Sequence, residues 1–449
     1  MAARGIAAAA VAALSCAADA SANGAFETYG ADARSRALAH AVVALPDIAA
    51  AHTNPAALGL ADSALAVAVS YSLDVPALEV SLAAARNADD PLAPARPPAV
   101  SALNLAFTQP VDLVGPDRLF VGAAAYFPTS VLVRARAFDP MRPFFAVYDS
   151  ATEHYDISVG AGLRLVDWLH LGAGMRLAAG QSGDVQLAVD PVRGRLVQQS
   201  MDTFQYPTFA PTAGLVLGPI GVDEVARASL GVVWREPIAF EVALPAALAI
   251  EGADVDAILD VLVVANYEPR SLTGGASVEI AHDLVVDVEA QWAMWSLAPP
   301  PMLVTRVDLG GEGLEALGLD ATLDAPAPGQ DRVRSPGYQD TLVWRAGVEW
   351  RPLVPLALRA GYQFRPTPVP DQTSGTNIVD ANAHVVALGL AVTFRLPHVF
   401  NQPITADLGY QAQLLEERAA IKTNPQDELG DWTASGAVHA LALGWSYRF

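Results

Sequence analysis

Residues able to carry out chemistry are few in this chain and are not grouped. It has a single cysteine, Cys16, and eight histidines, which include no H-x-x-x-H or comparable pair of metal ligands. No combination of serine, histidine and an acid stands out as a candidate for nucleophilic catalysis. We therefore predict no catalytic residues, no metal site and no cofactor, and we expect a protein that is not an enzyme.

Two other patterns have a chemical explanation and a simpler one. Four acids close together in sequence could bind a divalent cation, although a solvated acidic face explains them as well: Glu251, Asp254, Asp256 and Asp260. The segments Gly160-Ala161-Gly162 and Gly172-Ala173-Gly174 resemble parts of a dinucleotide-binding loop, but neither opens a helix nor has the third glycine. We expect these glycines to face each other on one hairpin.

Composition excludes several classes of protein. The formal net charge of −21 leaves no basic patch with which to bind nucleic acid. The mean hydropathy of +0.29 is high for a soluble protein, yet no apolar run after the first twenty residues approaches the roughly 20 residues that a membrane helix needs. The apolar residues lie in short alternating stretches broken by 34 glycines and 33 prolines, which indicates strands and turns.

The N-terminus has the pattern of a secretory signal peptide. Arg4 precedes a short apolar core, and small residues with two A-x-A sites follow. Cleavage after Ala20 or Ala22 would remove Cys16 and leave a mature chain without a thiol, whereas a lipoprotein signal ending at Cys16 fits the sequence poorly. We predict a signal peptide over residues 1–22 and export to the periplasm, the outer membrane or the medium.

The alternation of side chains has a polarity that identifies the solvent on each side. In the last segment one face carries large apolar residues and the other small or polar ones: Leu441, Leu443, Trp445, Tyr447 and Phe449 against Ala440, Ala442, Gly444, Ser446 and Arg448. The same contrast recurs at 283–293, 341–350 and 355–365. Such strands are typical of a transmembrane β-barrel with lipid outside and a polar lumen. A soluble sandwich, which also alternates, is the alternative.

The lengths of the connections predict the number of strands. Working back from the C-terminus, short and long links alternate, as the periplasmic turns and outer loops of a barrel do. The segment 65–84 begins the series, and its outward register changes at Pro76, as a β-bulge would produce. We predict an all-β fold, an antiparallel transmembrane barrel of fourteen strands over residues 63–449. The other thirteen strands are expected near 101–109, 118–128, 154–166, 169–180, 208–219, 225–236, 270–281, 283–297, 340–350, 355–366, 383–395, 404–417 and 434–449.

Residues 23–62 precede the barrel and contain no convincing strand. Their low charge and high apolar content disfavour the alternative of a disordered periplasmic extension. We predict that they form a plug in the lumen, with a turn at Asn54, Pro55 and Ala56 that shapes it. The small residues of the glycine-containing hairpin would make room for this plug.

Several segments, taken in order, resemble a known family: Tyr29-Gly30, Asn54-Pro55-Ala56-Ala57-Leu58, 286–296, Ser335-Pro336, 344–352, 358–362 and 366–371. They resemble the long-chain fatty-acid transporter (FadL/TodX) family of outer-membrane barrels. One departure is Ala39-His40-Ala41, where the family usually has glycines. The resemblance implies a fourteen-stranded barrel closed by an N-terminal hatch. It also implies passive uptake of hydrophobic compounds, with exit sideways through a break in the third strand.

Some residues are candidates for this function. The outer loop expected over 237–269 is unusually apolar, and exposed apolar patches mark binding surfaces; in the resembling family, loops at this position form the outer capture groove. The alternative is that the loop packs on its neighbours. Gly122 and Pro128 in the third strand weaken ladder pairing and are candidates for the lateral opening. The candidates for substrate binding are Phe26, Phe240, Val242, Leu244, Leu259 and Leu262.

Five arginines are expected to face the lumen: Arg164, Arg176, Arg345, Arg359 and Arg365. They could pair with a substrate carboxylate or with lumenal acids such as Asp287, Glu289 and Glu349, and we favour the acids.

The prediction is an outer-membrane channel for passive uptake of long-chain fatty acids or aromatic hydrocarbons. The alternatives are a surface barrel that acts as an adhesin or structural envelope protein, and a general porin. We expect hydrophobic small molecules, outer-membrane lipids and the barrel assembly machinery as partners, no nucleic acid, and a monomeric chain.

Overall fold

The structure is a computed structural model. It describes residues 21–449 except 23, 62–63, 84–93, 95, 131–141, 146, 149–153, 191–194, 223–224, 251–254, 300–303, 311–320, 324–335, 374–375, 425–426 and 428. Within 21–22, 179–205, 240–266, 304–310 and 321–323 it describes the backbone alone.

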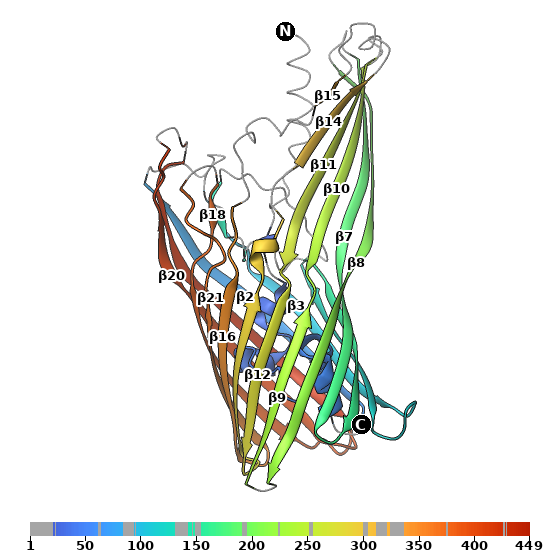
Figure 1. Ribbon diagram of the computed structural model, residues 1–449, viewed down its shortest axis with the longest axis vertical. Helices are drawn as coiled ribbons and strands as arrows, with labels where there is room; N and C mark the ends of the chain where they lie inside the picture. Colours follow the sequence, from blue (N-terminus) through green and yellow to red (C-terminus); the bar gives the residue numbers. More distant parts are fainter. Residues whose placement is uncertain are drawn as a thin grey trace.

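The chain forms a closed antiparallel β-barrel (Figure 1). Fourteen strands each pair with the next, and the last strand pairs with the first along its whole length, which closes the wall. The predicted fold class is therefore confirmed. No helix in the described ranges is both long and apolar enough to cross a membrane. The strands are β2 (Ala66–Leu82), β3 (Val100–Val111), β4 (Leu119–Pro128), β6 (Asp156–Val166), β7 (Leu169–Asp190), β8 (Arg195–Val222), β9 (Ala226–Arg235), β12 (Ser271–Ile280), β13 (Leu284–Ala293), β16 (Thr341–Leu353), β17 (Leu356–Arg365), β19 (Ala383–Phe394), β20 (Ile404–Ala420) and β21 (Trp432–Arg448).

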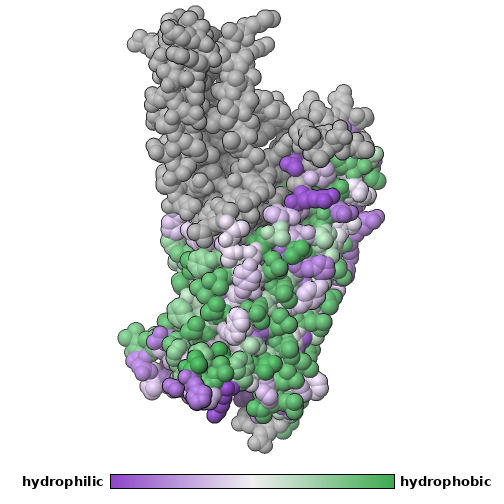
Figure 2. Space-filling model, turned by 180° about the vertical axis from the view of Figure 1, so that it is seen from behind, coloured by the Kyte–Doolittle hydropathy of each residue, from purple (hydrophilic) through white to green (hydrophobic). Residues whose placement is uncertain are grey.

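The alternation in the sequence sets which face of each strand meets lipid. On β21, Leu441 and Trp445 are exposed on the outer face, whereas Ala440 and Ala442 are buried in the lumen. The outer surface is consequently a broad band of apolar side chains around the middle of the barrel (Figure 2). Most strands have one apolar side because their other side faces a filled interior that is polar over much of its surface.

Strand β2 differs from the sequence prediction. Its pairing with β21 runs from Ala66 to Leu82 with no register shift, so the bulge expected at Pro76 is wrong. Leu78 is instead buried in the lumen, where it packs in an apolar cluster with Tyr148. The apolar residues change sides along β2 because the lumen itself becomes apolar toward the outer end. Pro76 is tolerated because pairing with β3 ends at Asp74.

Beyond one side of the barrel, a projecting part of the same sheet continues outward (Figure 1). It consists of the outer parts of β7 and β8 together with β10 (Ile238–Ile250), β11 (Val255–Glu268), β14 (Val304–Gly310) and β15 (Ala321–Leu323). β10 pairs in parallel with β7 and antiparallel with β11, which in turn pairs with β14. The outer loops expected over 181–207 and 237–269 are therefore wrong in secondary structure, because these segments supply one another with ladder partners.

The N-terminal segment fills the barrel. It contains α2 (Ala25–Tyr29), α3 (Ala33–Ala37), α4 (Ala50–Thr53) and the 3-10 helix η1 (Pro55–Leu60), drawn in blue inside the wall in Figure 1. We call residues 24–61 the hatch. Before it, β1 (Ser21–Ala22) pairs in parallel with β11, and toward the outer end a short pair, β5 (Phe144–Phe145) with β18 (Ile378–Val379), and η2 (Trp295–Leu297) complete the elements.

Glycines in the wall give the hatch its room. Gly160 pairs with Gly174 and Gly162 with Gly172 on the β6–β7 hairpin, as the sequence predicts. A Cβ atom at Gly172 would lie 2.1 Å from the amide nitrogen of Ala56 in the hatch. The backbone of the hatch thus rests directly on the backbone of the wall, and no other residue leaves that space.

Candidate functional site: the hatch and the lumenal wall

One side of the hatch is held by charged and polar contacts. The Arg34 guanidinium lies 2.9 Å from the Glu349 carboxylate on β16, and Arg36 lies 2.5 Å from Asp74 on β2. The Val43 amide donates a hydrogen bond to the Glu289 carboxylate on β13. Apart from Arg34, whose side chain is 18% exposed, these groups are almost fully buried, so each pair is costly to separate.

Glu27 is the polar centre of the hatch. Its carboxylate lies 2.8 Å from Arg235 on β9 and 3.9 Å from Arg345 on β16. Burial by itself raises the pKa of Glu27, but the two guanidinium groups outweigh burial and hold the pKa well below its ordinary value. Glu27 is therefore ionised, and it bridges two separate strands of the barrel wall.

Asn54 organises the turn that the sequence singles out. Its side-chain amide donates to the Val43 carbonyl at 2.8 Å, and its side-chain oxygen accepts from the Ala56 amide at 3.1 Å. Pro55 begins η1, where its missing amide hydrogen costs nothing. Asn54 and Ala56 are completely buried. Their role in shaping the hatch remains a prediction about function.

The part of the hatch that faces β4 is apolar. The lumenal residues of β4 are all without charge: Phe120, Gly122, Ala124, Tyr126 and Pro128. Phe26 and Ala49 of the hatch pack in one cluster with Ala124 and Tyr126, and Leu58 packs in another with Phe120. We call these residues of β4 and of the hatch the apolar seam. It is closed, since all the members named here are buried.

The candidates for a lateral opening lie on this strand. Pairing between β4 and β6 is regular from Leu119 to Tyr126 and does not include Pro128, which pairs only with Ala102 on β3. A Cβ atom at Gly122 would lie 2.8 Å from the Leu58 side chain, so Gly122 makes room for the hatch. The opening itself stays a prediction.

The candidates for substrate binding are in two places. Phe26 lies inside the barrel, with its ring 4.5 Å from that of His52 and 5.9 Å from that of Tyr126. The others lie in β10 and β11, whose backbone alone is described there: Phe240, Val242, Leu244, Leu259 and Leu262. The structure therefore does not bring Phe26 together with the residues of the projecting sheet in one described site.

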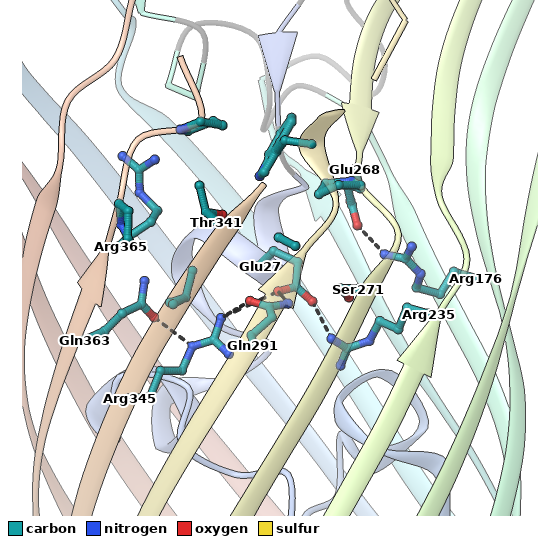
Figure 3. A pocket seen from close by; sticks show the side chains of 16 residues that line it. Glu27, Arg176, Arg235, Glu268, Ser271, Gln291, Thr341, Arg345, Gln363 and Arg365 are labelled. Atoms are coloured by element: carbon teal, nitrogen blue, oxygen red, sulfur yellow. Dashed lines mark hydrogen bonds and ion pairs between the residues drawn. The ribbon is translucent and has the colours of Figure 1, made fainter. Parts of the chain in front are cut away.

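A pocket lies in the lumen above the hatch (Figure 3). It contains about 530 Å³ of empty space, its open mouth included, and Glu27 lies on its lining with side chains from several strands. The charged residues that line it are Arg176, Arg235, Arg345, Arg365, Glu27 and Glu268. The pocket is thus far more polar than the apolar seam.

The arginines predicted from the sequence do face the lumen and pair mainly with acids. Arg359 lies 2.7 Å from Glu349, and Arg345 lies 3.8 Å from Glu289. Arg164 instead donates to two hatch carbonyls, those of Gly59 and Ala61. Arg176 and Arg365 pair with Glu268 and Asp380, which the sequence did not indicate, and Asp287 forms no ion pair within the described residues. Arg235 and Glu27 were also missed.

The possible cation site does not gain support. Glu251 and Asp254 lie outside the described residues, and the side chains of Asp256 and Asp260 are not described. Among the described residues, no group of three or more histidines, cysteines or acids is arranged to hold a metal ion.

A closed barrel of fourteen strands with an apolar outer face and a filled lumen defines a plugged β-barrel of the outer membrane. Residues 276–449 match the family described as outer membrane protein transport protein (OMPP1/FadL/TodX). The family resemblance predicted from the sequence is therefore confirmed, and the location in the outer membrane with it.

Individual relatives are more distant. The chain is 28% identical over 114 residues to alkane uptake protein A of Marinobacter nauticus, a match that covers 25% of each chain. The chain thus spans about a quarter of the length of this curated relative. Its fold is similar to the crystal structure of a Pseudomonas aeruginosa FadL homologue, with 16% identity, a TM-score of 0.56, and coverage of 96% of this chain and 99% of that one. It is also similar to the P. putida toluene transporter TodX, with 15% identity, a TM-score of 0.54, and coverage of 93% and 98%.

Proposed function

We propose that this protein is a passive channel that takes up hydrophobic compounds across the outer membrane. The compounds are long-chain fatty acids, aromatic hydrocarbons or other molecules of similar character. In this proposal they enter at the outer end, pass between the hatch and the wall, and leave sideways into the membrane beside the third strand of the barrel, β4.

The observation that carries the proposal is the apolar seam. A hydrophobic molecule gains nothing from a wide water-filled pore, because water is the solvent that it avoids. Along β4 it would meet Phe120, Ala124 and Tyr126 on one side and Phe26 and Leu58 on the other. The Arg164 guanidinium, 5.1 Å from the centre of the Phe120 ring, is a charged group beside this path. The seam is nevertheless a largely apolar route past the hatch.

The relatives support the same class of cargo. One is named for alkane uptake and another for toluene transport. The lateral exit rests on less: among the described residues the pairing of β4 with β6 ends at Tyr126, whereas Phe127 and Pro128 pair with β3 alone.

The other two functions considered fit less well. A general porin needs an aqueous passage, and the hatch fills the lumen. An adhesin would use the projecting sheet of β7, β8, β10, β11 and β14, and it would show no uptake.

Uptake of a labelled long-chain fatty acid and a labelled alkylbenzene tests the proposal. Cells that lack their own channel for such compounds would express the full chain or carry an empty vector. Heat-modifiable migration would establish that the barrel is folded. We expect faster uptake of at least one compound with the chain. Rates equal to those of the vector, with a folded barrel in the outer membrane, would contradict the channel and favour the adhesin.

A pair of variants tests the route. Ala124→Asn and Ala124→Leu add similar volume to the apolar seam, but only asparagine adds a polar group. Leaving that group unpaired costs roughly 1–3 kcal/mol, so uptake should fall about 5- to 150-fold more with asparagine than with leucine. Equal rates for the two variants would place the route elsewhere.

A further inference from the structure

The pocket above the hatch is lined by arginines that already have partners within the protein. Four arginines line it, Arg176, Arg235, Arg345 and Arg365. An incoming carboxylate would be attracted to an arginine only if that arginine lacked an acid of its own. The partners of each arginine therefore decide what the pocket accepts.

Two of the arginines are paired with acids that also line the pocket. Arg235 lies 2.8 Å from Glu27, and its other donors reach the His52 and Thr53 carbonyls at 3.0 Å and 2.5 Å. Arg176 pairs with Glu268 and also donates to the Glu236 carbonyl at 2.9 Å. Figure 3 shows both pairs pointing toward one another across the pocket wall.

The other two arginines are equally engaged. Arg365 pairs with Asp380 at 2.9 Å. Arg345 lies within 3.9 Å of Glu27 and 3.8 Å of Glu289, and it donates to the side-chain oxygens of Gln291 and Gln363 at 2.6 Å and 2.9 Å. The Nε atoms of Arg176, Arg235 and Arg365 have no partner in the described structure, but they are buried and so cannot reach a molecule in the pocket.

Four arginines are thus matched by four acids: Glu27, Glu268, Glu289 and Asp380. A fatty-acid carboxylate in this pocket would have to displace one of these acids or remain unpaired, and either step leaves a charge uncompensated away from water. A neutral hydrocarbon needs no charged partner and meets neither cost. Negative specificity of this kind comes from the unfavourable interaction with the wrong molecule.

We infer that the channel selects neutral hydrophobic molecules over ionised fatty acids, and that Glu27 and Glu268 are the specificity-determining acids. The inference rests on the proposed uptake function. Each of the two acids occupies the arginine that a carboxylate would otherwise use. Glu268 is the better residue to change, because Glu27 also holds the hatch.

The test uses two labelled solutes with the same chain length, hexadecane and palmitate, taken up by cells that express the full chain. For the wild type we expect a higher rate with hexadecane, each rate corrected for the vector. Glu268→Gln releases Arg176, so the ratio of palmitate to hexadecane uptake should rise about tenfold or more. The double variant Arg176→Gln with Glu268→Gln removes the released charge and should return the ratio to the wild-type value.

A matched control removes an acid without releasing an arginine. Asp287 is a buried lumenal acid that forms no ion pair in the described part of the chain, so Asp287→Asn should leave the ratio unchanged. Heat-modifiable migration of each variant checks that the barrel is folded. If the wild type takes up palmitate as fast as hexadecane, or if Glu268→Gln leaves the ratio unchanged, the inference is overturned while the proposed function stands. If neither solute exceeds the vector, both are overturned.

Discussion

Replacing Gly172 by alanine tests whether the wall of the barrel is shaped to the hatch. The added Cβ atom would lie 2.1 Å from the amide nitrogen of Ala56 and 2.2 Å from the carbonyl carbon of Pro55, and both are backbone atoms that cannot swing away. Ordinary contacts begin near 3.4 Å. The hatch must therefore retreat by roughly 1 Å at this point to relieve the overlap.

The expected size of the effect follows from the cost of overpacking. Inserting an extra methyl group into a closely packed interior costs about 1–3 kcal/mol. If the hatch relieves that cost by moving, the population of displaced hatches rises about 5- to 150-fold. The barrel itself should fold normally, because the ladder hydrogen bonds of β7 do not depend on the side chain at this position.

The assay is leakage of a small polar solute from liposomes that contain the purified chain. Gly274→Ala is the matched control: Gly274 is also a strand glycine, but a Cβ atom there would meet nothing within 4 Å. We expect faster leakage with Gly172→Ala and wild-type leakage with Gly274→Ala. Equal leakage from the two folded variants would refute the idea that wall glycines hold the hatch in position.

Two further predictions concern the polar side of the hatch. Asp74→Asn leaves Arg36 buried without its counter-charge, which costs roughly 3–5 kcal/mol. A cysteine introduced at the buried Ala57 should then react faster with a hydrophilic thiol reagent. Unchanged reactivity would contradict a role for the pair of Arg36 and Asp74 in holding the hatch. Burial lowers the pKa of His40 from 6.5 to about 3, with Arg345 and Arg36 lowering it further and Glu27 and Gln411 opposing. Because a displaced hatch would bind the proton first, the contribution of His40 to hatch stability is present above about pH 6.5 and is lost as the pH falls toward 3. Between about pH 7.5 and pH 5 the leakage of the wild type should therefore rise relative to that of a His40→Asn variant.

Much of the barrel can be predicted from the sequence, because each strand has one solvent on each side. The contrast between Trp344 or Trp350 outside and Arg345 or Glu349 inside repeats at every second residue, and lipid imposes it on all strands alike. The pairing of Gly160 with Gly174 and of Gly162 with Gly172 could be predicted for the same reason.

The errors arise where that contrast ends. Beyond the membrane, strand and loop residues meet the same water, so the sequences of 181–207 and 237–269 do not indicate whether these segments pair. The change of register at Pro76 predicts Leu78 on the outer face of the barrel. That is wrong, because apolar residues also fill the outer part of the lumen. The partner of Arg235 could not be found either, since Glu27 is distant in sequence and lies on a short helix with no repeating pattern.

The two sides of the hatch explain how a filled barrel can still conduct. Opening the polar side would separate buried pairs such as Arg34 with Glu349, and each separation leaves charges without partners. Opening the apolar seam separates Phe26 and Leu58 from β4, and a hydrophobic solute that enters the gap replaces the lost contacts with its own. The energetic cost of passage is therefore lowest for the molecules that the seam resembles. Water and ions replace nothing there, so the proposed channel would admit hydrophobic solutes and stay closed to polar ones.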